Sequence, residues 1–226
     1  MSEGAGSDTW VVLATTARVA LTATALSVPL GVVIGYGLAR HRFVGRTLVE
    51  TFVALPLVLP PTAIGYVLLT LFARDGWLGP RALGFDPDVL FTWRAAVIAS
   101  TVVALPLVAR TARAAFEDVD PRYELMARTL GRSRWNTWFT VTLPLARRGL
   151  LAASALGFGR ALGEFGATVI VAGSIPGRTQ TLALAIFNDI QLGDTRGALR
   201  LVAITALVAF ALVFWIGRLE SRERRA

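Results

Sequence analysis

The sequence predicts an all-α protein that crosses a membrane about five times and has a helical hairpin on its cytoplasmic side. Of its 226 residues, 54% are hydrophobic and 17% are charged, whereas a soluble domain has roughly 25% charged residues. The charges are segregated, because residues 19–39 and 51–73 contain none. Each of these runs matches the length of about 20 apolar residues that crosses a bilayer. The arginines gather in alternate connections between the apolar runs.

The first three spans are expected at residues 11–39, 51–73 and 93–115. The first is too long for a signal peptide and follows acidic rather than basic residues, so we expect it to be retained. The second contains Pro56, Pro60 and Pro61, which interrupt a helix. Such a break lines a cavity in some transporters and is a packing kink in other proteins, and both alternatives stay open. The third span has only a short charge-free centre.

The last two spans are expected at residues 149–173 and 201–217. The fourth contains an arginine and a glutamate. The fifth is short and requires the arginines at both of its ends to extend into the interface. Residues 179–188 are apolar but too short to span, and predict a helix that lies in the interface.

The distribution of arginine predicts the orientation of the chain. Residues 40–46, 110–148 and 218–226 hold 15 Arg and 6 acidic residues, whereas residues 1–9, 74–94 and 174–200 hold 6 Arg and 7 acidic residues. The positive-inside rule places the first set in the cytoplasm. We therefore expect a multi-pass inner-membrane protein with its N-terminus outside and its C-terminus in the cytoplasm. The net charge of +8 then indicates orientation rather than nucleic-acid binding.

The composition excludes several classes of chemistry. The chain has no cysteine, no lysine and one histidine, His41. Disulfides, thiolate chemistry, a multi-histidine metal site, a Schiff-base lysine and a phosphate-binding loop with its lysine are thereby excluded. We expect no catalytic residue, metal or cofactor in this chain.

Residues 116–148 form the longest cytoplasmic connection and predict two short helices. Asp120 suits an N-cap and Pro121 the first helical position, with Glu124 in the first turn. Gly131 suits the left-handed residue that ends this helix, and Ser133 can cap the second. The apolar face of the first helix is expected to comprise Leu125, Met126, Ala127 and Leu130. From the residues alone, this hairpin either anchors in the lipid headgroups or docks to a soluble partner.

This segment resembles the conserved cytoplasmic loop of the permeases of ABC importers of type I. The loop pattern is Glu-Ala-Ala, three residues, Gly, nine residues and Ile-x-Leu-Pro, and it aligns here on Gly131, Leu143 and Pro144 without a gap. Leu125 and Met126 depart from the first two positions, and Ala127 matches the third. Residues 159–181, which include a Gly-Glu-Phe-Gly core, resemble the molybdate branch of the family.

The resemblance implies one transmembrane domain over residues 1–226, with residues 116–148 as the segment that couples it to an ATPase. The residues that it assigns to coupling are Asp120, Pro121, Glu124, Leu125, Met126, Ala127, Gly131, Leu143 and Pro144. It also implies a homodimer in the lipid membrane, two ABC ATPase subunits that bind ATP and Mg²⁺, and an extracytoplasmic binding protein. The function that it implies is import of an oxyanion, molybdate first, with tungstate or sulfate as alternatives and a secondary transporter as a remoter one.

The candidate translocation path comprises Arg160, Gly163, Glu164, Gly166, Ser174 and Thr181. Arg160 and Glu164 are spaced by four residues, which predicts one helical face, and they either face the path or lock the fourth span to a neighbour. Gly159 and Gly163 have the spacing of closely packed helices, within one subunit or at the dimer seam. Ser174 and Thr181 flank an outer loop that either contacts the anion or is simply solvated.

Overall fold

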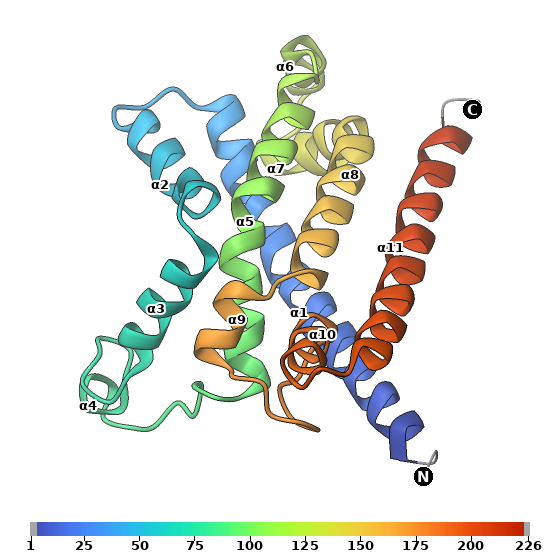
Figure 1. The fold of residues 1–226 in the computed structure, drawn as a ribbon. Helices are drawn as coiled ribbons and strands as arrows, with labels where there is room; N and C mark the ends of the chain where they lie inside the picture. The colour runs from blue at the N-terminus through green and yellow to red at the C-terminus, as the bar shows by residue number, and fades with distance from the viewer. Residues whose placement is uncertain (1–3, 224–226) are drawn as a thin grey trace.

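The computed structural model describes residues 4–223, and all regular elements in that part of the chain are helical (Figure 1). The prediction of an all-α fold is confirmed. In chain order the helices are α1 (Gly4–Arg40), α2 (Arg46–Val58), α3 (Pro61–Phe72), α4 (Pro80–Leu83), α5 (Trp93–Glu117), α6 (Pro121–Thr129), α7 (Arg134–Thr137), the π-helix η1 (Trp138–Thr142), α8 (Leu143–Leu162), α9 (Gly166–Val171), α10 (Leu182–Gln191) and α11 (Thr195–Glu223).

Two of the described helices are long and apolar enough to cross a bilayer on their own. They are α1, from Thr9 to Arg40, and α5, and they contain the first and third expected spans. Helices α2 and α3 make a third span if the bent pair is counted as one. The expected interfacial helix is α10, which is apolar and too short to span.

The second expected span is broken between α2 and α3, which meet at an angle of 110°. Leu59 precedes a proline and is extended, with φ −70° and ψ 140°, as the ring of the following residue requires. Pro60 and Pro61 supply no backbone N–H, so helix α3 begins anew at Pro61. Pro56 lies inside α2, so the expectation that it too breaks the helix is wrong.

The fourth expected span differs most from its predicted limits. The chain is continuously helical from Arg134 to Leu162 through α7, η1 and α8. The second arm of the α6–α7 hairpin therefore continues into α8 without a break, and Pro144 in the first turn of α8 does not separate them. Helix α8 ends at Leu162, and α9 begins four residues later at Gly166. The span expected as one helix over residues 149–173 is thus two helices with a break.

Helix α5 lies at the centre of the bundle and packs closely against α1 and α8. A Cβ atom added at Gly31 of α1 would lie 2.7 Å from Val108 Cγ1, and one at Gly157 of α8 would lie 2.6 Å from Val108 Cγ2. The core around these contacts is rich in alanine, including Ala112 and Ala153, which are fully buried. Small residues at helix contacts are the usual means of close packing in membranes.

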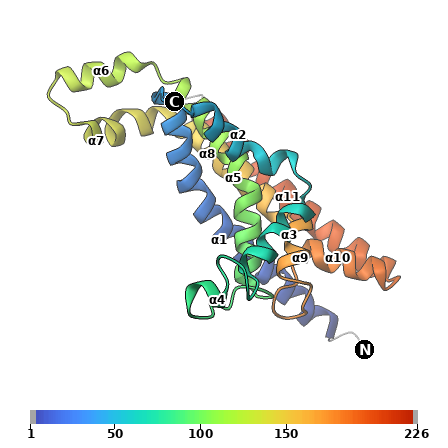
Figure 2. The ribbon, with the colours of Figure 1, turned by 90° about the vertical axis from the view of Figure 1, so that its left-hand side faces the viewer.

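The connections separate into two ends, as the alternating arginine content predicts. The α1–α2 connection, the α6–α7 hairpin and the end of α11 lie at one end, which is uppermost in Figure 1 and is called the arginine-rich end. The start of α1, helix α4 and the α9–α10 connection lie at the opposite end. Figure 2, turned by 90°, shows the hairpin projecting sideways beyond the other helices.

Candidate functional site

The hairpin at the arginine-rich end is built by local capping interactions. Asp120 Oδ1 accepts a hydrogen bond from the N–H of Arg122 at 2.9 Å, and Pro121 opens α6. Gly131 has φ +85° and ends the helix, while the N–H of Arg132 donates to the carbonyl of Ala127 at 3.1 Å. This is the bonding pattern of a Schellman motif. The expected cap of the second arm is also present, from the Asn136 N–H to Ser133 Oγ at 3.2 Å.

Glu124 holds this hairpin on the helical bundle. Its Oε1 accepts from Arg40 Nε at 3.0 Å and from Thr142 Oγ1 at 3.0 Å. Arg40 Nη2 also lies 2.9 Å from Glu124 Oε1 and donates to the carbonyl of Val119 at 2.8 Å. The Arg40 and Glu124 side chains are only 12% and 17% exposed. One carboxylate therefore joins α6 to the end of α1 and to η1.

The hairpin exposes apolar side chains that do not contribute to the core. Leu125, Met126 and Leu130 are 58%, 63% and 83% exposed, whereas Ala127 is 8% exposed and faces inward. Of the remaining coupling candidates, Leu143 packs partly against the core and Pro144 is exposed. A shallow hollow of about 520 Å³ beside Leu125 is lined by Leu125, Arg128, Thr129, Arg132, Ser133 and Arg134. The exposed surface of the hairpin thus combines apolar side chains with neighbouring arginines. The lining of the hollow contains no acidic side chain.

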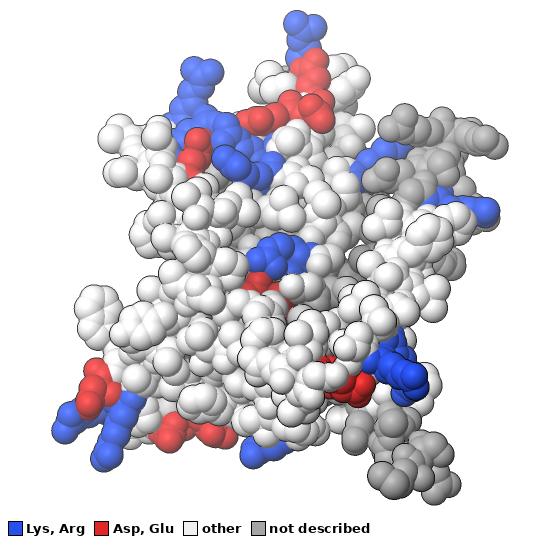
Figure 3. Space-filling view, viewed as in Figure 1, with Lys and Arg blue, Asp and Glu red and all other residues white. Residues whose placement is uncertain are grey.

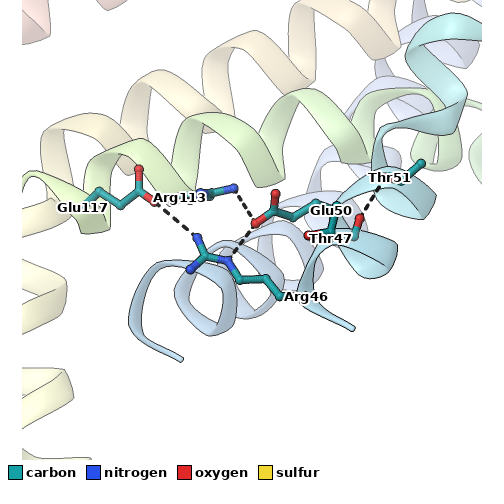
Figure 4. A network of polar contacts seen from close by, with 6 residues as sticks. All are labelled: Arg46, Thr47, Glu50, Thr51, Arg113 and Glu117. Atoms are coloured by element: carbon teal, nitrogen blue, oxygen red, sulfur yellow. Dashed lines mark hydrogen bonds and ion pairs between the residues drawn. The ribbon is translucent and has the colours of Figure 1, made fainter. Parts of the chain in front are cut away.

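A second charged network fixes α2 to α5 at the same end of the bundle (Figure 4). Glu50 Oε1 lies 2.8 Å from Arg46 Nε and 2.9 Å from Arg113 Nη1, and Arg113 Nε lies 2.7 Å from Glu117 Oε1. Two arginines and two glutamates therefore neutralise one another. Sequence reasoning missed this network, although the four-residue spacing of Arg46–Glu50 and Arg113–Glu117 was a signal for its two helical pairs.

Arg160 and Glu164 form the expected ion pair, with 2.7 Å between Nη1 and Oε2. They do not share a helical face, because α8 ends at Leu162 and Glu164 lies in the break before α9. The other Glu164 oxygen, Oε1, accepts from the N–H of Ala167 at 2.8 Å, so the carboxylate also caps α9. The Glu164 side chain is 1% exposed and that of Arg160 is 30% exposed.

The structure divides the other path candidates into two groups. Gly163 ends α8 and Gly166 begins α9, so both lie at the break with Arg160 and Glu164. Ser174 and Thr181 lie in the α9–α10 connection, beyond the other end of α9. Ser174 is exposed and Thr181 is 4% exposed at the start of α10. The structure therefore brings four of the six residues together.

Of the two alternatives for Gly159 and Gly163, close packing against another helix of the same subunit does not occur. A Cβ atom added at Gly159 would meet nothing within 4 Å, and one at Gly163 would meet only the Gly159 carbonyl at 3.8 Å. The contacts are made instead by Gly157, against Val108, and by Gly166, against Pro61.

The opposite end of the bundle has a hollow of about 450 Å³ between the start of α1, the α9–α10 connection, α10 and α11. Asp189, Asp194 and Arg200 are its charged lining residues. Burial raises the pKa of Asp189, and the negative charge of Asp194 raises it further. Among the described residues, no group of three or more His, Cys, Asp or Glu side chains is placed to hold a metal ion.

Residues 27–225 match the family described as binding-protein-dependent transport system inner membrane component. The chain is 40% identical over 220 residues to the molybdenum transport system permease protein ModB of Escherichia coli K12, covering 95% of this chain and 96% of that protein. It is 36% identical over 195 residues to the sulfate transport system permease protein CysT of the same strain, covering 86% of this chain and 70% of that one.

The fold resembles a chain of the MetNI methionine ABC transporter, with a TM-score of 0.70 at 18% sequence identity and 97% of both chains covered. This likeness concerns the fold, while the family match and the two relatives concern the sequence over most of its length. The chain belongs to the family of binding-protein-dependent transport system inner membrane components.

Proposed function

We propose that this chain is the membrane-spanning permease subunit of an ATP-driven importer that moves molybdate into the cytoplasm. The observation that supports this most is the identity of 40% with a molybdenum permease over 95% of the chain. The alternative of a sulfate importer is supported by the lower identity of 36% with a sulfate permease. Tungstate remains a second alternative, because it is also a tetrahedral dianion. Family membership gives no support to a secondary transporter.

The hairpin is the part of the chain that we assign to an ATPase partner. It projects from the bundle and exposes Leu125, Met126 and Leu130, which would be covered by a cleft on a soluble subunit. The contact of Glu124 with Arg40 and Thr142 would transmit a movement of the hairpin to α1 and to the continuous helix that becomes α8. Two ATPase subunits, with ATP and Mg²⁺ bound to them, would drive a homodimer of this chain in this way.

The opposite end of the bundle is assigned to the extracytoplasmic binding protein. This places the arginine-rich end in the cytoplasm, with the N-terminus outside, as the positive-inside rule predicts. The exposed loop residue Ser174 and the hollow beside Asp189 lie at this end. No covalent chemistry is assigned to the chain, whose role is to open and close a path.

Uptake by a reconstituted complex tests the proposed function. The chain is assembled with its ATPase and binding protein in proteoliposomes, and uptake of radiolabelled molybdate is measured with and without ATP. We expect ATP-dependent uptake that unlabelled molybdate competes away more effectively than sulfate does. Preferential competition by sulfate would assign the chain to sulfate import. ATP hydrolysis without uptake of any of the three oxyanions would contradict the proposal.

A further inference from the structure

Two breaks between consecutive helices lie next to each other in this protein. Helix α3 begins at Pro61 after the 110° bend, and α9 begins at Gly166 after the end of α8. A Cβ atom added at Gly166 would lie 2.8 Å from Pro61 Cβ, and one at Gly65 would lie 2.8 Å from the carbonyl oxygen of Ala167. The starts of the two helices therefore pack nearly backbone to backbone. In membrane transporters, interrupted helices line the cavity through which the substrate moves.

Arg160 lies near the end of α8, next to the break before α9. Only one side of its guanidinium has a polar partner. Nη1 forms the ion pair with Glu164, and the remaining Nε–Nη2 edge has no polar partner in the part of the chain that the structure describes. Space next to it is open, because Gly159 and Gly163 are exposed and face no other helix. Figure 3 shows one small basic and acidic patch isolated near the middle of an otherwise uncharged region, between the charged ends.

In Glu164, in contrast, both carboxylate oxygens have a polar partner. Oε2 pairs with Arg160, and Oε1 accepts the N–H of Ala167 in α9. Its side chain is 1% exposed, so it is shielded from an approaching anion. Glu164 thus fixes the direction of the Arg160 guanidinium and cancels its charge, while the free edge still presents two donors.

Arg18 provides a contrast within the same bundle. It also lies in an apolar helix, α1, but its guanidinium carbon lies 3.7 Å from the ring centroid of Trp93. This cation–π contact covers one face of the cation. Arg18 lies in the unbroken helix α1, which makes it a control for the loss of an arginine from an apolar span.

We propose that the Nε–Nη2 edge of Arg160 is a transient binding site for a tetrahedral oxyanion in the translocation path, and that Glu164 is its positioning residue. This inference rests on the proposed function. The planar fork of a guanidinium donates two parallel hydrogen bonds to an oxyanion. Because Glu164 cancels the net charge, the site holds a dianion weakly enough to release it, which conduction requires. In a homodimer, each copy contributes one such edge.

The doubly neutral variant Arg160→Gln with Glu164→Gln tests the proposal without leaving a buried charge unpaired. The amide oxygen that replaces the carboxylate at position 164 can still accept the Ala167 N–H and keep α9 capped. The variant is assembled with the ATPase and binding protein, its co-elution is checked, and molybdate uptake is measured in proteoliposomes. We expect uptake to fall at least about tenfold, the factor for losing a charged hydrogen bond. Arg160→Lys keeps the positive charge but loses the two parallel donors of the guanidinium. Its molybdate uptake should lie between that of the doubly neutral variant and that of wild type.

The control Arg18→Gln should take up molybdate at the wild-type rate. Wild-type uptake by the assembled doubly neutral variant would overturn the proposal and leave the proposed function intact. Failure of that variant to assemble would also overturn the proposal, because the ion pair would then be required for folding or assembly rather than for binding the anion. Proteoliposomes with the wild-type complex are measured in parallel. If the wild-type complex takes up no oxyanion, the proposed function itself has failed, and this outcome is distinct from the results above.

Discussion

Gly131 is the residue of the hairpin with a left-handed backbone conformation. Its φ is +85°, and a Cβ atom there would meet nothing within 4 Å. The need for glycine is therefore conformational rather than steric. The two hydrogen bonds around it, from the Gly131 N–H to Arg128 and from the Arg132 N–H to Ala127, depend on that conformation.

Replacement of Gly131 by valine should strain the turn and lower transport. A left-handed conformation costs an L-residue about 1–2 kcal/mol, and a β-branched residue is among the worst suited to it. We expect Gly131→Val to insert in the membrane normally but to retain less ATPase on affinity purification and to import less molybdate. Gly131→Asn is the matched control, because asparagine tolerates this region. Equal ATPase retention by the valine variant and wild type would contradict the coupling role of the turn.

At the scale of whole elements, one carboxylate joins helix α6 of the hairpin to α1 and to η1. Glu124 contacts Arg40 at the end of α1 and Thr142 in η1, and η1 continues into α8. The far end of α8 holds Arg160. The second arm of the hairpin and the charged break therefore lie at opposite ends of one continuous helical stretch.

Neutralising Glu124 should loosen the hairpin without unfolding the bundle. Glu124→Gln removes the charge that Arg40 faces in a mostly buried position, and hydrogen bonds to charged groups contribute about 1.5–3 kcal/mol. We expect a lower melting temperature of the purified complex and more ATP hydrolysed per molybdate imported. The control is Asp75→Asn, which breaks an exposed pair with Arg81. Exposed pairs contribute about 0–1 kcal/mol, so this variant should match wild type. If both variants hydrolyse the same amount of ATP per molybdate imported, the contact of Glu124 with Arg40 has no role in coupling.

For the whole molecule, the two ends of the bundle should face opposite sides of the membrane. Val44 is fully exposed at the arginine-rich end, and Trp77 is 84% exposed at the other. Because the chain has no cysteine, Val44→Cys and Trp77→Cys each provide a single labelling site. A membrane-impermeant maleimide should label only Trp77→Cys in intact cells and both variants after permeabilisation. Labelling of Val44→Cys from outside would reverse the orientation.

Much of this fold could be predicted from the sequence because it depends on neighbours close in the chain. One long uncharged run gives α1, and Pro60 and Pro61 interrupt the second such run between α2 and α3. A helix cap forms between residues that are close in the chain, so the caps at Asp120 and Ser133 were identifiable from the local sequence. The charge-free centre of the third span is short, yet α5 is more enclosed than α1, since it packs at the centre of the bundle.

The sequence by itself determined the helical class, the membrane-spanning runs, the hairpin caps and the segregation of arginine to one end. Only the tertiary structure decided that Glu124 pairs with Arg40, 84 residues away, and that α8 ends before Glu164. It also decided that Gly157 packs against α5 while Gly159 faces open space. The physical reason is the distance along the chain between the residues that interact. A cap or a break at prolines is settled by adjacent residues. An ion pair between distant helices, the end of α8 and the face that a glycine presents depend on how the helices pack.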